Sequence, residues 1–194
     1  GDSEFTDNME DGSVTINKNG RFIHCITIIG QIEGHYVLPQ NTKATRYEHI
    51  IPRLVAVEEN PDAKWKIIMA HHDLYSGRIP HRESENALLR MIWGPLADEF
   101  DVDLVLLGHS HYYTVTNVLY NQKTIQPYAE KMINPEGTLY MVAGSITRPR
   151  EDEDIGLNEK WIGAWNTPDE RQIYNVLDFT ENTLTVSSYY KGED

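Results

Sequence analysis

The stretch Asp103–His111, DLVLLGHSH, decides how the rest of the chain is interpreted. Its apolar run, Leu104–Leu107 with Val102 just before it, is typical of a strand that is buried on both faces, as in a parallel sheet. The run stops at Gly108, and two histidines follow it within three residues. The stretch therefore predicts a buried parallel strand that ends in a polar, histidine-rich loop.

A second stretch has the same design. Another short apolar run, Trp65–Ala70 (WKIIMA), ends in His71 and His72. Between the two stretches, apolar residues repeat at helical spacing over Glu83–Phe100, which predicts a strand–helix–strand unit with parallel strands. Because the carboxyl ends of parallel strands meet at one edge of a sheet, we expect the histidines to gather there and to form the functional site.

Length and charge limit the classes of function. The 194 residues suit one domain, and 40% hydrophobic with 24% charged residues is ordinary globular composition. The net charge of −13 argues against general binding to nucleic acid or to an anionic membrane surface, because the summed field repels phosphates. No apolar run approaches the roughly 18 residues of a membrane span, so we expect no membrane partner. A bound metal ion or clustered arginines could still attract a single phosphate.

The lone Cys25 excludes an internal disulfide framework and a cysteine-based zinc site. It lies in an apolar run and is interpreted as a buried small hydrophobic residue. Cysteine poverty suits the cytosol and also many secreted bacterial proteins, so the compartment stays open.

The chain is predicted to have two parts. Residues 1–13 are acidic and poor in apolar residues, which indicates a tail or linker, and residues 14–192 form one domain. Within that domain, Val14–Ile29 is typical of a hairpin with a turn at Asn17–Gly20, and Thr45–Glu59 carries a helical stripe. Residues 150–160 are predicted to form a solvated acidic loop. Further strands are predicted at Tyr112–Leu119, Thr138–Ala143, Ile173–Phe179 and Thr183–Tyr190.

His109 and His111 are two residues apart, so both imidazoles leave the backbone in the same general direction if the chain stays extended. Neutral imidazole is a common ligand of zinc, iron and manganese. Together with His71, these histidines could hold a single catalytic zinc ion, whereas a dinuclear site also needs bridging carboxylates. The alternative is that the histidines are polar residues at loop tips. His72 either binds metal or turns away from it.

A resemblance to a known family rests on three segments: Asp62–Gly77 (DAKWKIIMAHHDLYSG), Val102–His111 (VDLVLLGHSH) and Leu139–Ser145 (LYMVAGS). Together they resemble the C-terminal half of the calcineurin-like metallophosphoesterases, in the purple acid phosphatase-like branch. The resemblance covers residues 45–148. It implies an α/β fold, namely a calcineurin-like β-sandwich flanked by helices, of which this chain supplies the C-terminal half of the four-layer αββα arrangement.

The resemblance also implies a metal site. His71 and His109 would bind one metal ion and His111 the other, and the pair would be two divalent ions or Fe(III) with a divalent ion, drawn from iron, zinc and manganese. The family's Asp-x-His and Gly-Asn-His motifs do not occur upstream of His71, and the Gly-Asp at Gly1-Asp2 lies in the acidic tail, which is the wrong context for the family motif. The implied partner is therefore the N-terminal half of the same domain, absent, cleaved off or carried on a separate chain, and this chain alone is expected to be inactive.

Several residues are candidates for contact with a phosphate-ester substrate. His81 stands ten positions beyond His71, where purple acid phosphatases have a histidine that faces substrate, so it could protonate the leaving-group oxygen. The alternative is an exposed loop histidine. Arg78, His72 and Tyr112 are the predicted substrate-binding residues, although an aromatic residue such as Tyr112 at the start of a strand often serves packing.

The predicted function is metal-dependent hydrolysis of phosphoric esters, in which hydroxide generated from metal-bound water attacks phosphorus in line. One alternative is a mononuclear three-histidine zinc hydrolase. Metallo-β-lactamase-like enzymes are disfavoured for that role, since Tyr112 and Tyr113 follow His111 where those enzymes have Asp-His. The other alternative is a non-catalytic relic or binding domain. One departure from the family pattern is Asp73, which stands where many members have proline after the histidine pair.

Overall fold

The structure is a computed structural model of the chain. It describes residues 4–8, 13–18, 21–28, 54–55, 59, 65–70, 72–75, 83–145, 160–165, 171–180 and 182–192, and for 4–8, 13–18, 21–28 and 83–85 it describes the backbone only. Helix α2 spans Glu83–Glu99. The described strands are β1 (Glu4–Asn8), β2 (Ser13–Lys18), β3 (Arg21–Ile28), β4 (Lys66–Ala70), β5 (Leu104–Leu107), β6 (Tyr113–Thr116), β7 (Val118–Tyr120), β8 (Lys123–Gln126), β9 (Leu139–Ala143), β10 (Ile162–Trp165), β11 (Ile173–Phe179) and β12 (Leu184–Tyr190).

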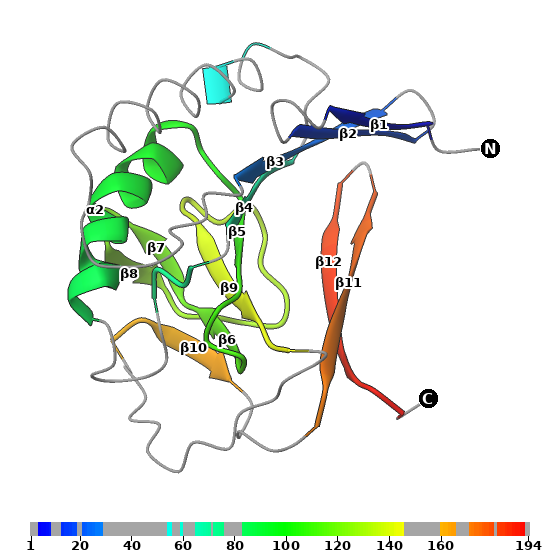
Figure 1. Ribbon diagram of the computed structural model, residues 1–194. Helices are drawn as coiled ribbons and strands as arrows, with labels where there is room; N and C mark the ends of the chain where they lie inside the picture. The colour runs from blue at the N-terminus through cyan, green and yellow to red at the C-terminus, as the bar shows by residue number, and fades with distance from the viewer. Residues whose placement is uncertain are drawn as a thin grey trace.

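Eight of these strands form the main sheet, in the order β1-β2-β3-β4-β5-β9-β6-β10 (Figure 1). The central strands β3, β4, β5 and β9 are parallel, and the strands outside them pair antiparallel. In the register of β4 with β5, Met69 lies opposite Leu106. The loops that follow β4 and β5 therefore leave the sheet at the same edge and at nearly the same level.

Helix α2 connects β4 to β5, as the sequence predicts. Its apolar residues Leu89, Ile92, Trp93 and Leu96 are buried in one cluster with residues of the sheet. Pro95, inside the helix, is exposed. This strand–helix–strand unit confirms the prediction that the two histidine-bearing strands are neighbours.

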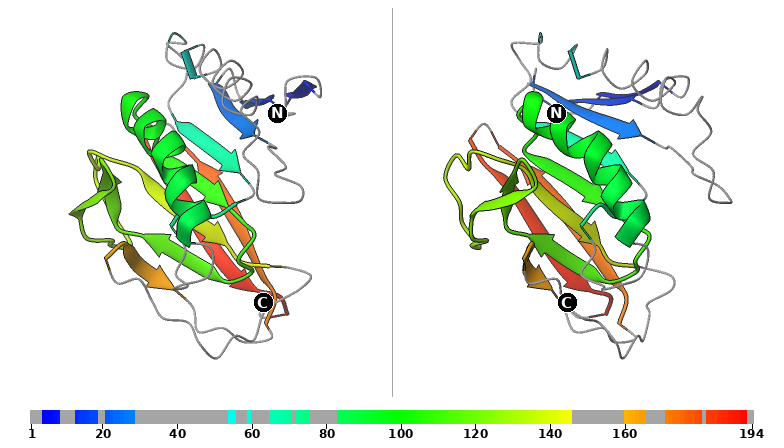
Figure 2. Two further views of the ribbon diagram at one scale, coloured as in Figure 1. Left: turned by 60° about the vertical axis from the view of Figure 1, so that its left-hand side comes forward. Right: turned by 90° about the vertical axis from the view of Figure 1, so that its left-hand side faces the viewer.

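The sheet is covered on both faces, because successive residues of its central strands point to opposite sides. In the first core cluster, Ile68, Val105 and Val142 pack with α2. In the second core cluster, Ile67, Leu104 and Met141 pack with the hairpin β11–β12. Figure 2 shows α2 on one side of the sheet and this hairpin on the other. The described residues thus form three layers, namely helix, sheet and hairpin, which agrees with the predicted α/β sandwich fold.

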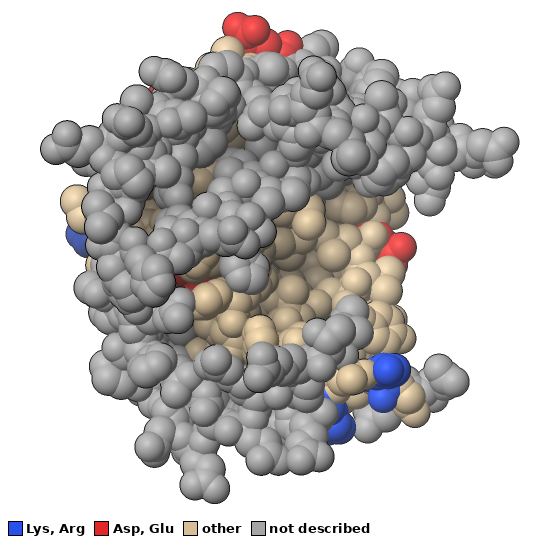
Figure 3. Space-filling view, in the orientation of Figure 1, with Lys and Arg blue, Asp and Glu red and all other residues tan. Residues whose placement is uncertain are grey.

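The space-filling view has the orientation of Figure 1, with the main sheet at the centre and the hairpin at the right (Figure 3). The described surface is hollowed there and is almost free of charged side chains. Half-buried apolar residues of the hairpin, Leu177, Phe179, Leu184 and Val186, pack against the second core cluster on this side. The second cluster is therefore built across two separate parts of the chain.

The structure differs from the sequence-based expectations in three places. Within residues 1–13, expected to be a tail or linker, β1 pairs with β2 through backbone hydrogen bonds, which need no apolar side chains. The single strand expected over 112–119 is two strands, because Asn117 breaks the run: its N–H donates to Trp161 O and its side-chain oxygen accepts from Tyr128 N–H. The sequence predicts that Trp93, Trp161 and Trp165 are packing residues, but Trp165 is 51% exposed.

Other expectations are confirmed or lie outside the described residues. The hairpin of β2 and β3 and the strands β4, β9, β11 and β12 lie where the sequence predicts them. Trp93 and Trp161 are buried, as expected. Of the helix predicted over Thr45–Glu59, only Leu54 and Val55 are described as helical, and most of the acidic loop at 150–160 lies outside the described residues. The short strands β8 and β10 were not predicted.

Two glycines lead to opposite predictions for stability. Gly94 lies inside α2, where an added methyl group would make ordinary van der Waals contacts with Gln122 Cγ at 3.6 Å and Tyr75 Oη at 3.9 Å, so Gly94→Ala should stabilise the protein by about 0.5–1 kcal/mol. In β10, a methyl group on Gly163 would clash with Tyr128 Cβ and with Asn117, so Gly163→Ala should destabilise the protein by about 1–3 kcal/mol. Urea unfolding of both variants measures the difference, and equal effects would contradict this account of the packing.

A partly buried carboxylate, that of Asp103, ties the amino ends of β4 and β5 together. The Lys66 backbone N–H donates to Asp103 Oδ2 at 2.8 Å. Burial raises the pKa of the Asp103 carboxyl, and this hydrogen bond offsets part of the effect. Because the folded state then binds the proton more tightly than the unfolded state, Asp103 favours folding at low pH and loses that contribution as pH rises through its pKa.

We therefore expect the unfolding free energy of the wild type to fall, relative to that of Asp103→Asn, as pH rises from about 4 to 7. Asparagine retains an acceptor for the Lys66 N–H and does not titrate. Urea unfolding at a series of pH values gives the difference between the two proteins. A difference that is constant with pH would refute the assignment.

Candidate functional site

Two loops meet at the carboxyl edge of the sheet. His72 follows β4, His109 follows β5, and each lies three residues beyond the paired Met69 and Leu106. The two imidazole rings are stacked, with centroids 4.7 Å apart and planes inclined by 29°. The register of the parallel strands therefore brings together two histidines that are far apart in the sequence.

The GHSH loop is not extended, contrary to the condition on which the sequence-based expectation rests. His109 and His111 have φ values of 70° and 65°, in the left-handed region that non-glycine residues rarely adopt. The Ser110 N–H donates to Gly108 O at 2.8 Å, so residues 108–110 form a γ-turn centred on His109. Such conformations cost on the order of 1–3 kcal/mol per residue and persist only where neighbouring structure enforces them.

A side-chain hydrogen bond joins the two loops beside the stacked rings. The Ser110 hydroxyl donates to Asp73 Oδ2. Asp73 is only 3% exposed, so its carboxylate needs partners inside the protein. The residue between the two histidines of the GHSH motif is thus bonded to the residue that follows His72.

His111 carries a polar atom that its surroundings leave unsatisfied. Its Nδ1 is buried and has no hydrogen-bond partner in the described part of the chain. A buried imidazole nitrogen without a partner is costly, and a metal ion is one group that satisfies it. The chemistry of this atom, an imidazole nitrogen two residues along the chain from His109, fits a transition metal such as zinc, iron or manganese.

Arg90 of α2 binds the loop that follows β4. Arg90 is 3% exposed and donates from Nη1 to Leu74 O at 2.7 Å. Its guanidinium lies 4.5 Å from the centre of the Trp161 ring and 5.5 Å from that of Tyr75. Tyr75 in turn packs edge-on against Tyr140, with ring centroids 4.6 Å apart, and burial raises the pKa of both tyrosines. The predicted site did not include this cluster, although an arginine within the apolar run ALLRMIW was a signal for it.

The structure describes some of the predicted site residues and not others. His71, Arg78 and His81 lie outside the described residues, so their roles stay predictions. Tyr112 is 4% exposed, and its role in substrate binding stays a prediction as well. Among the described residues, no three histidines, cysteines or carboxylates form a group that could hold a metal ion.

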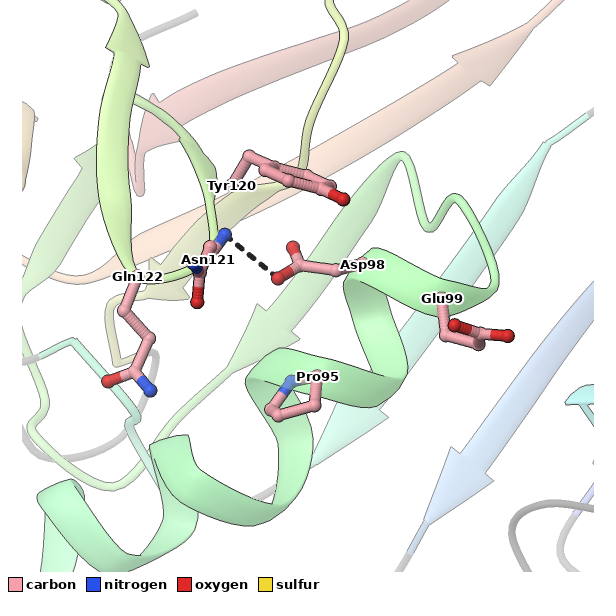
Figure 4. Close-up of a pocket in the computed structure, with 6 residues that line it drawn as sticks. All are labelled: Pro95, Asp98, Glu99, Tyr120, Asn121 and Gln122. Carbon is pink, nitrogen blue, oxygen red and sulfur yellow. Dashed lines mark hydrogen bonds between the residues drawn. The ribbon is translucent and has the colours of Figure 1, made fainter.

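A separate pocket lies at the C-terminal end of α2 (Figure 4). Asp98 accepts a hydrogen bond from the Asn121 N–H at 2.8 Å, in the tight turn between β7 and β8. Burial raises the pKa of the Asp98 carboxyl, and this bond offsets part of the effect. Since α2 ends where β5 is about to begin, this pocket lies away from the edge that carries the histidines.

The fold and the two loops can now be compared with those of known protein families. The family model described as calcineurin-like phosphoesterase matches residues 4–113, which is more than half of the chain. The chain belongs to this family, and the family predicted from the GHSH motif is confirmed. The predicted restriction to a C-terminal half stays a prediction.

Two solved structures share the fold. A purple acid phosphatase isolated from seeds of yellow lupin (Lupinus luteus) has a TM-score of 0.64 at 17% identity, over 97% of this chain and 32% of that one. GAP50, the anchor in the inner membrane complex of Plasmodium, has a TM-score of 0.59 at 13% identity, over 99% of this chain and 50% of that one. At these identities the likeness concerns the fold alone.

A curated relative matches a shorter segment. The translocation-enhancing protein TepA of Halalkalibacterium halodurans is 57% identical over 47 residues, which is 24% of this chain and 18% of that protein. This chain therefore spans one half or less of each of these three proteins. In the part of the chain that the structure describes, no helix is long and apolar enough to cross a membrane.

The role of Arg90 in holding the loop after β4 is testable. Arg90→Lys should destabilise the protein by about 1–3 kcal/mol, because a lysine cannot both donate to Leu74 O and stack on Trp161. Arg171→Lys is the matched control, since the Arg171 guanidinium also covers a ring, 3.5 Å from the centre of Tyr190, but is exposed. Its cost should stay below about 1 kcal/mol. Equal losses of unfolding free energy in the two variants, measured by urea unfolding, would contradict the role of Arg90 in holding the loop after β4.

Proposed function

We propose that the protein hydrolyses phosphoric esters with the help of metal ions held at the edge where the loops after β4 and β5 meet. One observation supports this more than any other. In this chain, which belongs to the calcineurin-like phosphoesterase family, the Nδ1 atom of His111 is buried and has no partner among the described residues, and the same loop carries His109, which stacks on His72. A metal ion is the ligand that this arrangement fits best.

The proposed ligands are His109 and His111, with His71 from the end of β4. Imidazole nitrogen suits zinc, iron and manganese, and two such ions are proposed. When bound, they supply the Lewis acidity and the positive charge that phosphoester hydrolysis requires. A chain with a net charge of −13 needs such a concentrated positive charge in order to attract a phosphate ester.

The other proposed roles belong to side chains of the chain itself. His72, stacked on His109, orients that ring and stands close enough to the ligands to meet a bound substrate. Arg78 is proposed to donate hydrogen bonds to the phosphoryl oxygens, and His81 to protonate the leaving-group oxygen. Tyr112 is proposed to support the substrate side of the GHSH loop by its packing.

The activity is proposed for the whole protein. The chain spans 32% of the lupin phosphatase and 50% of GAP50, so further elements can contribute to the site. We propose that the carboxylate ligands of a dinuclear centre come from an N-terminal half of the domain, on the same chain or on another. The histidine loops described here would then be one side of a shared site.

His109→Ala and His111→Ala test the proposal in the whole protein, with p-nitrophenyl phosphate as substrate. Each should lower kcat by at least about 100-fold, because a bound metal ion contributes several kcal/mol to the stabilisation of the transition state. Metal content per chain, measured by elemental analysis, should fall in parallel. Lys123→Ala, on the exposed strand β8, serves as the control and should leave both quantities unchanged.

Wild-type turnover in both histidine variants would refute the proposed function. A wild type that neither retains metal nor hydrolyses phosphate esters would refute it too and would favour a non-catalytic binding domain.

A further inference from the structure

The GHSH loop has a conformation that its own backbone does not explain. His109 and His111 both have left-handed backbone conformations. Among the described residues, the one backbone hydrogen bond inside the loop is the γ-turn bond from the Ser110 N–H to Gly108 O. A turn of this kind is strained, and one such bond does not offset the cost of two left-handed residues. A contact from outside the loop has to hold it.

Asp73 supplies such a contact. Its carboxylate accepts the hydrogen bond of the Ser110 hydroxyl, from the middle of the strained segment, and Asp73 is itself only 3% exposed. The loop that carries Asp73 is held in turn, since Leu74 O accepts a hydrogen bond from the buried Arg90. A hydrogen bond to a carboxylate is stronger than one between two neutral groups.

We propose that Asp73 is a positioning residue that acts through Ser110: it holds the GHSH loop in its left-handed conformation and so sets His109 and His111 for metal binding. This inference rests on the proposed function, because it gives the two histidines their role as ligands. Asp73 touches neither metal nor substrate in this account. The loop conformation, however, is a property of the chain without any ligand, so it can be tested separately.

The same two strands provide a matched control. At their carboxyl ends Asp73 bonds to Ser110, and at their amino ends Asp103 bonds to the Lys66 N–H at 2.8 Å. Each is an aspartate that ties the β4 segment to the β5 segment, but only Asp73 touches the GHSH loop. A merely structural role for Asp73 would give Asp73→Ala and Asp103→Ala the same effects on metal binding.

The experiment measures two quantities in the whole protein for Asp73→Ala, Ser110→Ala, the double variant and Asp103→Ala. The first is the Zn²⁺ dissociation constant from calorimetric titration of metal-depleted protein. We expect it to rise by about 10–100-fold in Asp73→Ala and in Ser110→Ala, no further in the double variant, and by less than about 3-fold in Asp103→Ala. Asp73→Asn, which keeps an acceptor for Ser110, should recover much of the affinity.

The second quantity is amide hydrogen exchange, followed by NMR without metal. We expect Asp73→Ala to speed exchange of the Ser110 amide by at least about 10-fold and to leave the Lys66 amide unchanged, and Asp103→Ala to do the reverse. Unchanged exchange at Ser110 in a folded Asp73→Ala variant overturns the inference, whatever the metal titration gives. If the wild type binds no Zn²⁺, the proposed function fails and with it the metal part of the inference, while the exchange data still decide whether Asp73 holds the loop.

Discussion

The parallel pairing of β4 with β5 is the constraint on which the rest of the site depends. With Met69 opposite Leu106, the two strands end at the same level, and His72 and His109 come within stacking distance. A shift of one residue in this register would turn every side chain of one strand to the other face of the sheet. In β4 it would exchange Ile67 and Ile68 between the two core clusters and disrupt the packing of both, so the packing that stabilises the fold also fixes the spacing of the two loops.

The two layers that cover the sheet, α2 and the hairpin β11–β12, stabilise different parts of the edge that carries the histidines. Helix α2 buries its apolar residues against one face of the sheet, and its Arg90 donates a hydrogen bond to Leu74 O in the loop after β4. The hairpin β11–β12 covers the other face and is tied to the end of β9, where Asn175 donates to Ala143 O at 2.7 Å and the Ile173 N–H donates to Ser145 O at 3.0 Å. The edge that carries the histidines is therefore supported from both sides by elements that contribute no histidine to it.

Much of this arrangement could be predicted from local patterns. Apolar runs that end in histidine predicted β4, β5 and their shared edge, and helical periodicity predicted α2 between them. The strand at Glu4–Asn8 could not be predicted in this way, because its sequence is polar and its pairing with β2 depends on backbone hydrogen bonds. The break at Asn117 escaped for a related reason, since its partners Tyr128 and Trp161 lie 11 and 44 residues further along the chain.

The sequence by itself determined the family, the parallel strands and the histidines at their ends, because these depend on residue type and on periodicities that repeat within a few residues. Only the tertiary structure decided how those histidines are presented. The left-handed turn at His109, the bond from Ser110 to Asp73 and the unsatisfied nitrogen of His111 all depend on groups that approach from other segments. A contact of this kind leaves no periodic trace in the sequence, because its partners are set by packing and register across the sheet.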